Sequence, residues 1–211
     1  MDTFFFLIIL IFSVMLHELA HGYTADFLGD PTARMQGRLT LNPLKHIDPM
    51  GSIILPLLLK LSGSPILIGY AKPVPYNPYN LRGKYAEGLV AAAGPATNIA
   101  LAVIFGLVVR YLSAGVPLDQ LPPLVMAFGS IAFINMLLAL FNLIPIPPLD
   151  GSKVLSSVLP GVVGVEYNRF RARFERLGVL SGTLVILIVF YLLAPMFSSV
   201  LEALFRALTG L

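Results

Sequence analysis

The feature that most constrains this chain is a series of apolar segments of the length needed to cross a lipid bilayer. A transmembrane helix needs about 20 consecutive, mainly apolar residues. Of the 211 residues, 57% are hydrophobic and only 12% are charged, and the mean hydropathy is +0.85. These values predict an integral membrane protein. The apolar segments comprise residues 4–25, 53–68, 89–112, 121–144 and 177–205.

Two of these segments have features that complicate a simple crossing. Segment 53–68 is short and contains Pro56, Lys60 and Pro65, so we expect it to be re-entrant or interfacial. Segment 177–205 contains Pro195 and is expected to form either one kinked span or a span followed by an amphipathic surface helix.

The expected fold class is therefore an all-α integral membrane protein with a three-span core and a C-terminal span. The length predicts a single transmembrane domain over residues 1–211, without a separate soluble domain. Its core would comprise residues 1–151, and residues 152–211 would form a C-terminal juxtamembrane and transmembrane region.

The first apolar segment contains the sequence His17-Glu18-Leu-Ala-His21. Histidines four residues apart lie on one face of a helix, so both imidazoles can bind the same metal ion. The adjacent Glu18 carboxylate can take a proton from a metal-activated water and pass it to a leaving amine. A chance pair of histidines is a poor alternative, because an ionisable residue inside a spanning helix costs roughly 2.5 kcal/mol or more. The pattern indicates zinc-dependent peptide hydrolysis within the membrane.

A catalytic zinc site normally has three protein ligands, and this chain has no cysteine. Asp150 is the strongest candidate for the third ligand, because it follows an apolar helix and prolines 145, 147 and 148. Irregular backbone near membrane depth is tolerated where it lines a cavity or a polar site. The alternative is a solvated aspartate in a turn that ends the helix.

These segments resemble the site-2 protease family of intramembrane zinc metalloproteases, in its short form without a PDZ domain. The family combines a His-Glu-x-x-His helix with a later Asn-x-x-Pro-x-Pro-x-Leu-Asp-Gly segment, which here runs from Asn142 to Gly151. The resemblance implies that one Zn²⁺ is bound by His17, His21 and Asp150, and that Glu18 is the general base. It thus implies a zinc metalloendopeptidase that cleaves within or near transmembrane segments.

The resemblance extends to Gly94-Pro-Ala-Thr-Asn98, which looks like the Gly-Pro-x-x-Asn element of the family. It implies that Asn98 positions a substrate carbonyl or helps to stabilise the oxyanion, with Asn142 as a further candidate for such a role. The alternative for Asn98 is a packing amide on a kinked helix.

The implied partners are the lipid bilayer and transmembrane protein substrates, often regulators that another protease has already trimmed. An adaptor protein is another possible partner, nucleic acid is not expected, and the sequence carries no signal for the oligomeric state. A non-proteolytic zinc-binding membrane protein, such as a transporter or a chaperone-like relative, is the alternative function. Glu18 argues against it, because a simple zinc site needs no carboxylate beside its ligand pair.

The positions of the ligands also predict the topology. For His21 and Asp150 to meet at one depth, an odd number of spans must separate their helices, so segment 89–112 should cross and segment 53–68 should not. Of the 14 Lys and Arg residues, all but Arg110 and Arg206 lie in the connections 26–84 and 150–176. Because basic residues mark cytoplasmic loops, we expect the active site to face the cytosolic side of a prokaryotic plasma membrane, with an organelle membrane as the alternative.

Alternating residues at 34–41 and around 65–74 predict a small membrane-associated β-sheet. Its edge could bind an extended substrate, or the sheet could simply cap the membrane surface. We expect His46 to be a structural residue rather than part of the metal site. The basic residues of segment 169–176 are expected to contact anionic lipid, with partner docking as the alternative.

Overall fold

The computed structural model describes residues 3–48, 72–176 and 178–211. Throughout these ranges the regular secondary structure is helical. The four long helices are α1 (Thr3–Phe27), α4 (Ala86–Leu112), α5 (Pro123–Asn142) and α8 (Gly178–Thr209). Shorter helices are α2 (Thr32–Met35), α6 (Asp150–Val158) and α7 (Gly161–Glu175), and 3₁₀ turns occur at Pro43–His46, Pro78–Asn80 and Leu118–Gln120.

Within the described residues, four helical stretches are long and apolar enough to cross a membrane. This confirms the predicted all-α membrane class and agrees with four candidate spans. Segment 53–68, which was expected to be re-entrant or interfacial, lies outside the described residues. The four stretches are Phe4–Phe27, Ala86–Leu112, Pro123–Asn142 and Tyr191–Thr209.

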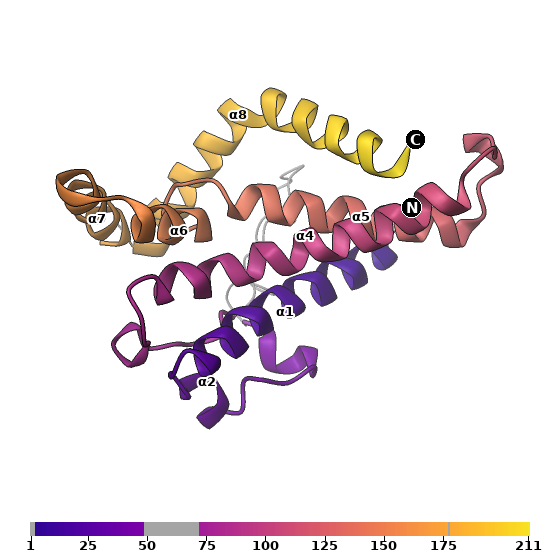
Figure 1. Cartoon of the computed structure of the whole chain (residues 1–211). Coiled ribbons are helices and arrows are strands. Elements are labelled where there is room, and N and C mark those ends of the chain that lie inside the picture. Colours follow the sequence, from indigo (N-terminus) through magenta and orange to yellow (C-terminus); the bar gives the residue numbers. More distant parts are fainter. Residues whose placement is uncertain (1–2, 49–71, 177) are drawn as a thin grey trace.

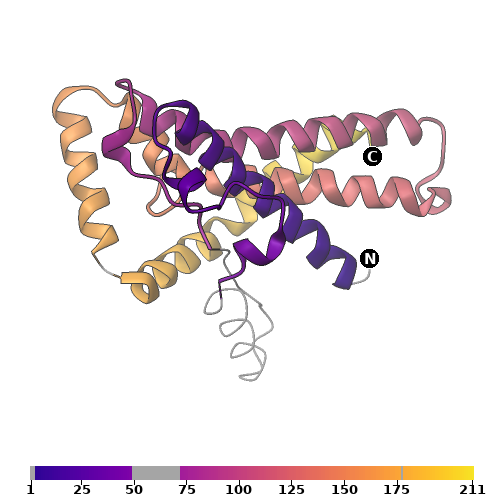
Figure 2. The same cartoon turned by 90° about the horizontal axis from the view of Figure 1, so that it is seen from below.

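Helix α4 is the centre of the bundle and packs against α1, α5, α6 and α8 (Figure 1). Helices α1 and α5 run in the same direction and α4 runs in the opposite direction (Figure 2). The C-terminal half of α1 and the end of α5 therefore lie at the same end of the bundle. Asp150, at the start of α6, is brought to the depth of His21 as the ligand argument required.

Prolines mark the start and the end of α5, whereas α4 accommodates a proline in its interior. Helix α5 starts at Pro123, where a missing N–H does no harm, and it ends three residues before Pro145. Helix α4 continues through Pro95, which transmembrane helices tolerate because neighbouring groups satisfy the freed carbonyl. The proline-rich connection after α5 then places Asp150 as the first residue of α6.

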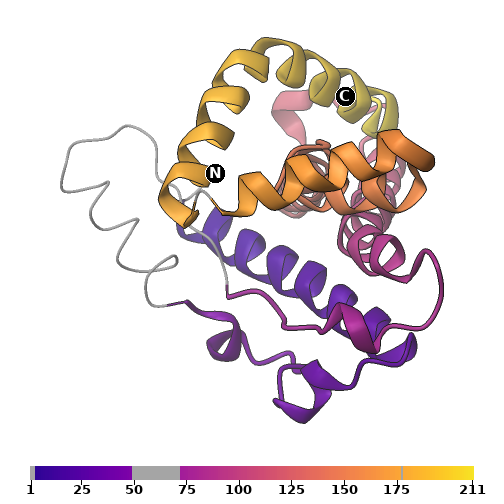
Figure 3. The same cartoon turned by 90° about the vertical axis from the view of Figure 1, so that its left-hand side faces the viewer.

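Helix α8 continues through Pro195 and curves over α4 and α5 (Figure 3). It approaches α4 closely at Gly106, where an added Cβ would lie 2.4 Å from Cδ2 of Leu208. Small residues at such crossings let transmembrane helices approach each other. On the outside, large apolar side chains such as Phe12 and Leu107 are about half exposed and are available to contact lipid.

The predicted strand at residues 34–41 is wrong. Arg34 and Met35 end α2, and Gly37 turns the chain with a φ of +61°. The buried Arg38 side chain then donates from Nη2 to the carbonyl oxygens of Lys72 (2.9 Å) and Pro73 (3.3 Å). The alternating residues thus belong to a loop that is held by the side-chain hydrogen bonds of Arg38, and not to a β-strand with main-chain hydrogen bonds. Of the other predicted strand, residues 65–71 lie outside the described ranges and residues 72–74 are not in a strand.

Candidate active site

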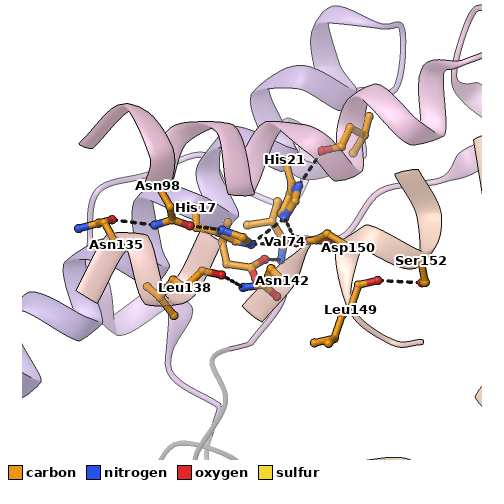
Figure 4. A network of polar contacts seen from close by, with 12 residues as sticks. His17, His21, Val74, Asn98, Asn135, Leu138, Asn142, Leu149, Asp150 and Ser152 are labelled. Atoms are coloured by element: carbon orange, nitrogen blue, oxygen red, sulfur yellow. Dashed lines mark hydrogen bonds and ion pairs between the residues drawn. The ribbon is translucent and has the colours of Figure 1, made fainter. Parts of the chain in front are cut away.

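Three potential ligand atoms converge between α1 and the start of α6 (Figure 4). Nε2 of His17 lies 3.0 Å from Nε2 of His21 and 3.1 Å from Oδ2 of Asp150. Nε2 of His21 lies 3.3 Å from the same aspartate oxygen. Both histidines are buried, and their rings meet edge to face. The three residues predicted to bind zinc are thus brought together.

Hydrogen bonds on the far side of each ring determine which nitrogen is free. Nδ1 of His21 donates to the carbonyl oxygen of Val90 at 2.7 Å, and Nδ1 of His17 contacts Oδ1 of Asn98 at 2.5 Å. With both Nδ1 atoms protonated, the two neutral rings present Nε2 lone pairs to each other. Two lone pairs 3.0 Å apart cannot form a hydrogen bond, so the arrangement is favourable only with a metal ion or a proton between the two nitrogens.

The donor set fits zinc in both chemistry and spacing. Two imidazole nitrogens and one carboxylate oxygen form a common catalytic zinc site that leaves the fourth position open. In a tetrahedral site with bonds of about 2.0–2.1 Å, neighbouring ligand atoms lie about 3.3 Å apart. The three observed separations of 3.0, 3.1 and 3.3 Å are close to this value.

The Asp150 carboxylate is largely buried, with 14% of its side chain exposed. Burial by itself would raise its pKa, but the hydrogen bonds and positive charge that His17 and His21 supply when their rings are protonated outweigh this effect and hold the pKa well below its usual range. Positive charge beside this carboxylate therefore favours its ionised form, which is the form that binds metal ions.

Gly94 on α4 leaves the space that the histidine rings occupy. A Cβ added there would lie 2.5 Å from Nε2 of His21 and 2.6 Å from Nε2 of His17. Real Cβ atoms essentially never approach heavy atoms so closely. Any other residue at this position would force the two histidine rings to move.

Glu18 lies in the same cavity as the three ligand residues, which has a volume of about 190 Å³. Its Oε2 accepts a hydrogen bond of 2.9 Å from the backbone N–H of Val74. The carboxylate is therefore oriented by the chain segment that precedes α4, rather than by its own helix.

Tyr76 and Lys153 also line the cavity, and the sequence reasoning missed both. Nζ of Lys153 lies 5.1 Å from the centroid of the Tyr76 ring. Burial lowers the pKa of Lys153, but the influence of Tyr76 and of nearby acidic groups outweighs it and raises the pKa, so the side chain stays cationic. Its position three residues after Asp150, on the same face of α6, was a usable signal. Tyr76 lies in an irregular segment that offered none.

The remaining predicted residues lie in different places. Asn142 lines the cavity, and its Nδ2 donates to the carbonyl oxygen of Leu138 at 3.0 Å. Asn98 is fully buried beside the cavity and contacts His17 and Asn135. His46 is outside the cavity and donates from Nε2 to the carbonyl oxygen of Thr40 at 2.9 Å.

Comparison with known proteins gives similarity to one family. The family model described as peptidase family M50 matches residues 119–189, which include Asp150. The chain is 36% identical over 211 residues to the Bacillus subtilis protein named "Putative zinc metalloprotease YwhC", with 92% of this chain and 86% of that relative covered.

Two other relatives are shorter matches. The Mycolicibacterium smegmatis protein named "Putative zinc metalloprotease Rip2" is 36% identical over 143 residues, covering 66% of this chain and 51% of Rip2. This chain thus spans about half the length of Rip2. The Methanocaldococcus jannaschii protein named "Putative zinc metalloprotease MJ0611" is 43% identical over 70 residues, or 33% of each chain. No solved structure matches significantly.

The similarity to YwhC covers most of both chains, and the M50 match covers the segment that carries the aspartate of the three-residue cluster. The chain therefore belongs to peptidase family M50, the site-2 protease family of intramembrane zinc metalloproteases.

Proposed function

We propose that His17, His21 and Asp150 hold the zinc ion of this intramembrane protease and that Glu18 is its general base. The observation that carries the proposal is the triangle of three ligand atoms in one cavity with the Glu18 carboxylate. A zinc ion held by these three residues would increase the acidity of the attacking water and would polarise the carbonyl group of the scissile peptide bond.

Glu18 would move the proton between the two halves of the reaction. Its carboxylate accepts a proton from the attacking water as the water oxygen bonds to the carbonyl carbon. It then donates that proton to the peptide nitrogen as the carbon–nitrogen bond breaks. The hydrogen bond from Val74 N–H to Oε2 supports this role, because it orients the carboxylate within the cavity.

The substrates of a protease in this setting are membrane proteins in the lipid bilayer. In a transmembrane helix every peptide group is hydrogen-bonded within the helix, so the segment must unwind before a carbonyl can enter a cavity of about 190 Å³. Among the two asparagines predicted to position substrate, Asn142 remains the better placed because it lines this cavity. Asn98 is fully buried and does not line it.

We place the active site on the cytosolic side of a prokaryotic plasma membrane. The connections at the active-site end of the bundle carry most of the basic residues, whereas the described α4–α5 connection, residues 113–122, carries none. Basic residues favour the cytoplasmic face. The bacterial and archaeal relatives support a prokaryotic membrane.

The deciding experiment compares purified wild type with Glu18→Gln in lipid, using a membrane-embedded reporter peptide and a measurement of bound zinc. We expect wild type to bind one zinc per chain and to cleave, and the variant to keep zinc while losing cleavage by roughly 100-fold or more. Glu166→Gln, at an exposed ion pair with Arg169, is the matched control and should behave as wild type.

Two outcomes would count against the proposal. Equal cleavage by wild type and Glu18→Gln would exclude Glu18 as the base. Zinc binding by wild type with no cleavage of a broad set of membrane-embedded peptides would favour a non-proteolytic zinc-binding protein.

A further inference from the structure

A chain of buried polar side chains connects His17 to the interior of the helix bundle (Figure 4). Nδ2 of Asn98 donates to Oδ1 of Asn135 at 2.7 Å. Nδ2 of Asn135 donates to Oγ of Ser13 and to the carbonyl oxygen of Ile131, each at 2.9 Å. Both asparagines are 0% exposed, and Ser13 is 4% exposed. The chain thus joins α1, α4 and α5 through three side chains besides His17.

The direction of these hydrogen bonds is determined at Asn135, the residue farthest from the histidines along the α5 side of the network. The carbonyl oxygen of Ile131 can only accept, so the amide nitrogen of Asn135 must face it, and Oδ1 of Asn135 must face α4. Asn98 must then present its own amide nitrogen to Asn135 and its oxygen to His17. An oxygen at that place requires a proton on Nδ1 of His17, which leaves Nε2 free to bind a metal.

The two histidines therefore reach the same tautomer by different routes. Nδ1 of His21 meets a backbone carbonyl directly, at Val90. His17 has no backbone carbonyl in that position and depends on two amide side chains, each of which could in principle rotate by 180°. A reversed amide would place a donor opposite a donor or an acceptor opposite an acceptor. In an apolar bundle water is not available to hydrogen-bond with these groups.

We propose that Asn135 is a positioning residue of the active site, which holds Asn98 in the one orientation that keeps Nδ1 of His17 protonated. The proposal rests on the proposed ligand set and adds a residue that does not touch the metal position. Neither its position in the sequence nor the cavity lining identifies Asn135 as part of the site. The signal in the sequence was an amide side chain in the middle of a largely apolar span.

The competing explanation is that the two amides only join the helices, as buried polar side chains do in other membrane proteins. Measuring zinc affinity together with stability distinguishes the two explanations. Loss of a hydrogen-bonding partner behind a metal ligand typically weakens metal binding by about 10–100-fold. Loss of a helix–helix contact lowers the melting temperature without changing zinc affinity per folded molecule.

The test is a set of purified variants in lipid, each measured for zinc dissociation by chelator competition and for melting temperature without metal. We expect about a 10–100-fold loss of zinc affinity in Asn135→Leu and in Asn98→Leu. Ser13→Ala should stay close to wild type, because the carbonyl of Ile131 still orients Asn135. Asn98→Asp should also retain zinc, since a neutral carboxylic acid can donate to Asn135 and accept from His17.

Thr209→Val is the matched control, because Thr209 is 0% exposed and its hydroxyl donates to the carbonyl oxygen of Phe205 on α8, away from the site. It should lower the melting temperature without changing zinc affinity. The proposal is overturned if Asn135→Leu binds zinc as tightly as wild type, whatever its melting temperature. A failure of the proposed ligand set would look different. In that case wild type would not bind zinc, or the His17→Ala variant would bind zinc as tightly as wild type.

Discussion

Three acidic residues at one end of the bundle have different surroundings and therefore different roles. Oδ2 of Asp150 faces two imidazole nitrogens, and Oε2 of Glu18 faces a backbone N–H next to the cavity. Asp30 is 0% exposed and accepts hydrogen bonds from Thr32, Asn77 and Asn80. The same functional group thus serves as a candidate ligand, a candidate base and a structural tie.

Replacing Asp150 by Asn should separate the ligand role from the base role. The amide is neutral and binds zinc poorly, so the loss of zinc affinity should exceed the 10–100-fold typical of a partner behind a ligand. Cleavage should disappear together with zinc, whereas Glu18→Gln should lose cleavage only. Zinc titration of both variants checks this, with Asp119→Asn in the α4–α5 connection as an exposed control. Retention of zinc by Asp150→Asn would remove it from the ligand set.

Asp30 should make the stability of the fold depend on acid pH. Burial raises its pKa, but the hydrogen bonds from Thr32, Asn80 and Asn77 outweigh this and hold the pKa below its ordinary value. The contribution is therefore complete above the unfolded pKa of about 3.9 and is lost as pH falls through the folded pKa. Asp30→Asn should lower stability at neutral pH by about 1–3 kcal/mol and flatten its decline below about pH 4. Unfolding in detergent as a function of pH measures both, and an unchanged acid slope would contradict the assignment.

At the level of elements, α4 organises the site without contributing a metal ligand. It carries Gly94, which makes room for the histidine rings, and Asn98, which contacts one of them. The segment between residues 72 and 80 is the second important element. Asp30 and Arg38 fasten it to the chain that follows α1, and Val74 there contacts Glu18.

Gly94→Ala should abolish zinc binding while Gly106→Ala should not. The new methyl group at position 94 would lie within 2.6 Å of the Nε2 atoms of His17 and His21, whose positions on a packed helix leave them little freedom to move. At position 106 it would meet Cδ2 and Cγ of the Leu208 side chain, which can change rotamer, and it would not meet either histidine. Zinc content and melting temperature of both variants test this. Normal zinc affinity in Gly94→Ala would show that the rings can shift without losing the ion.

At the level of the whole molecule, the proposed orientation can be tested directly because the chain has no cysteine of its own. Gln36 and Asp119 are both exposed, at opposite ends of the bundle. In intact bacterial cells, a maleimide that cannot cross membranes should label Asp119→Cys, and it should label Gln36→Cys only after permeabilisation. The reverse pattern would place the active site on the outer face.

Much of this molecule followed from local sequence patterns. The spans were predictable because the bilayer requires long apolar helices, and the histidine pair was predictable because helical spacing places residues 17 and 21 on one face. The loop around residues 34–41 was not predictable from its alternating polar and apolar residues. Its conformation depends on Arg38, whose side chain donates hydrogen bonds to carbonyl groups 34 and 35 residues away. Short-range periodicity cannot distinguish such a contact from a strand.

The sequence by itself determined the membrane class, the end of α5 before its prolines, and which residues are able to bind zinc. Only the tertiary structure decided which atoms meet: that Asp150 reaches both histidines, that Val74 orients Glu18, and that Asn135 lies behind Asn98. The reason is physical. Helix formation and membrane insertion depend on neighbours along the chain, whereas these contacts join residues 37 to 133 positions apart, and their geometry depends on how α1, α4 and α5 pack together.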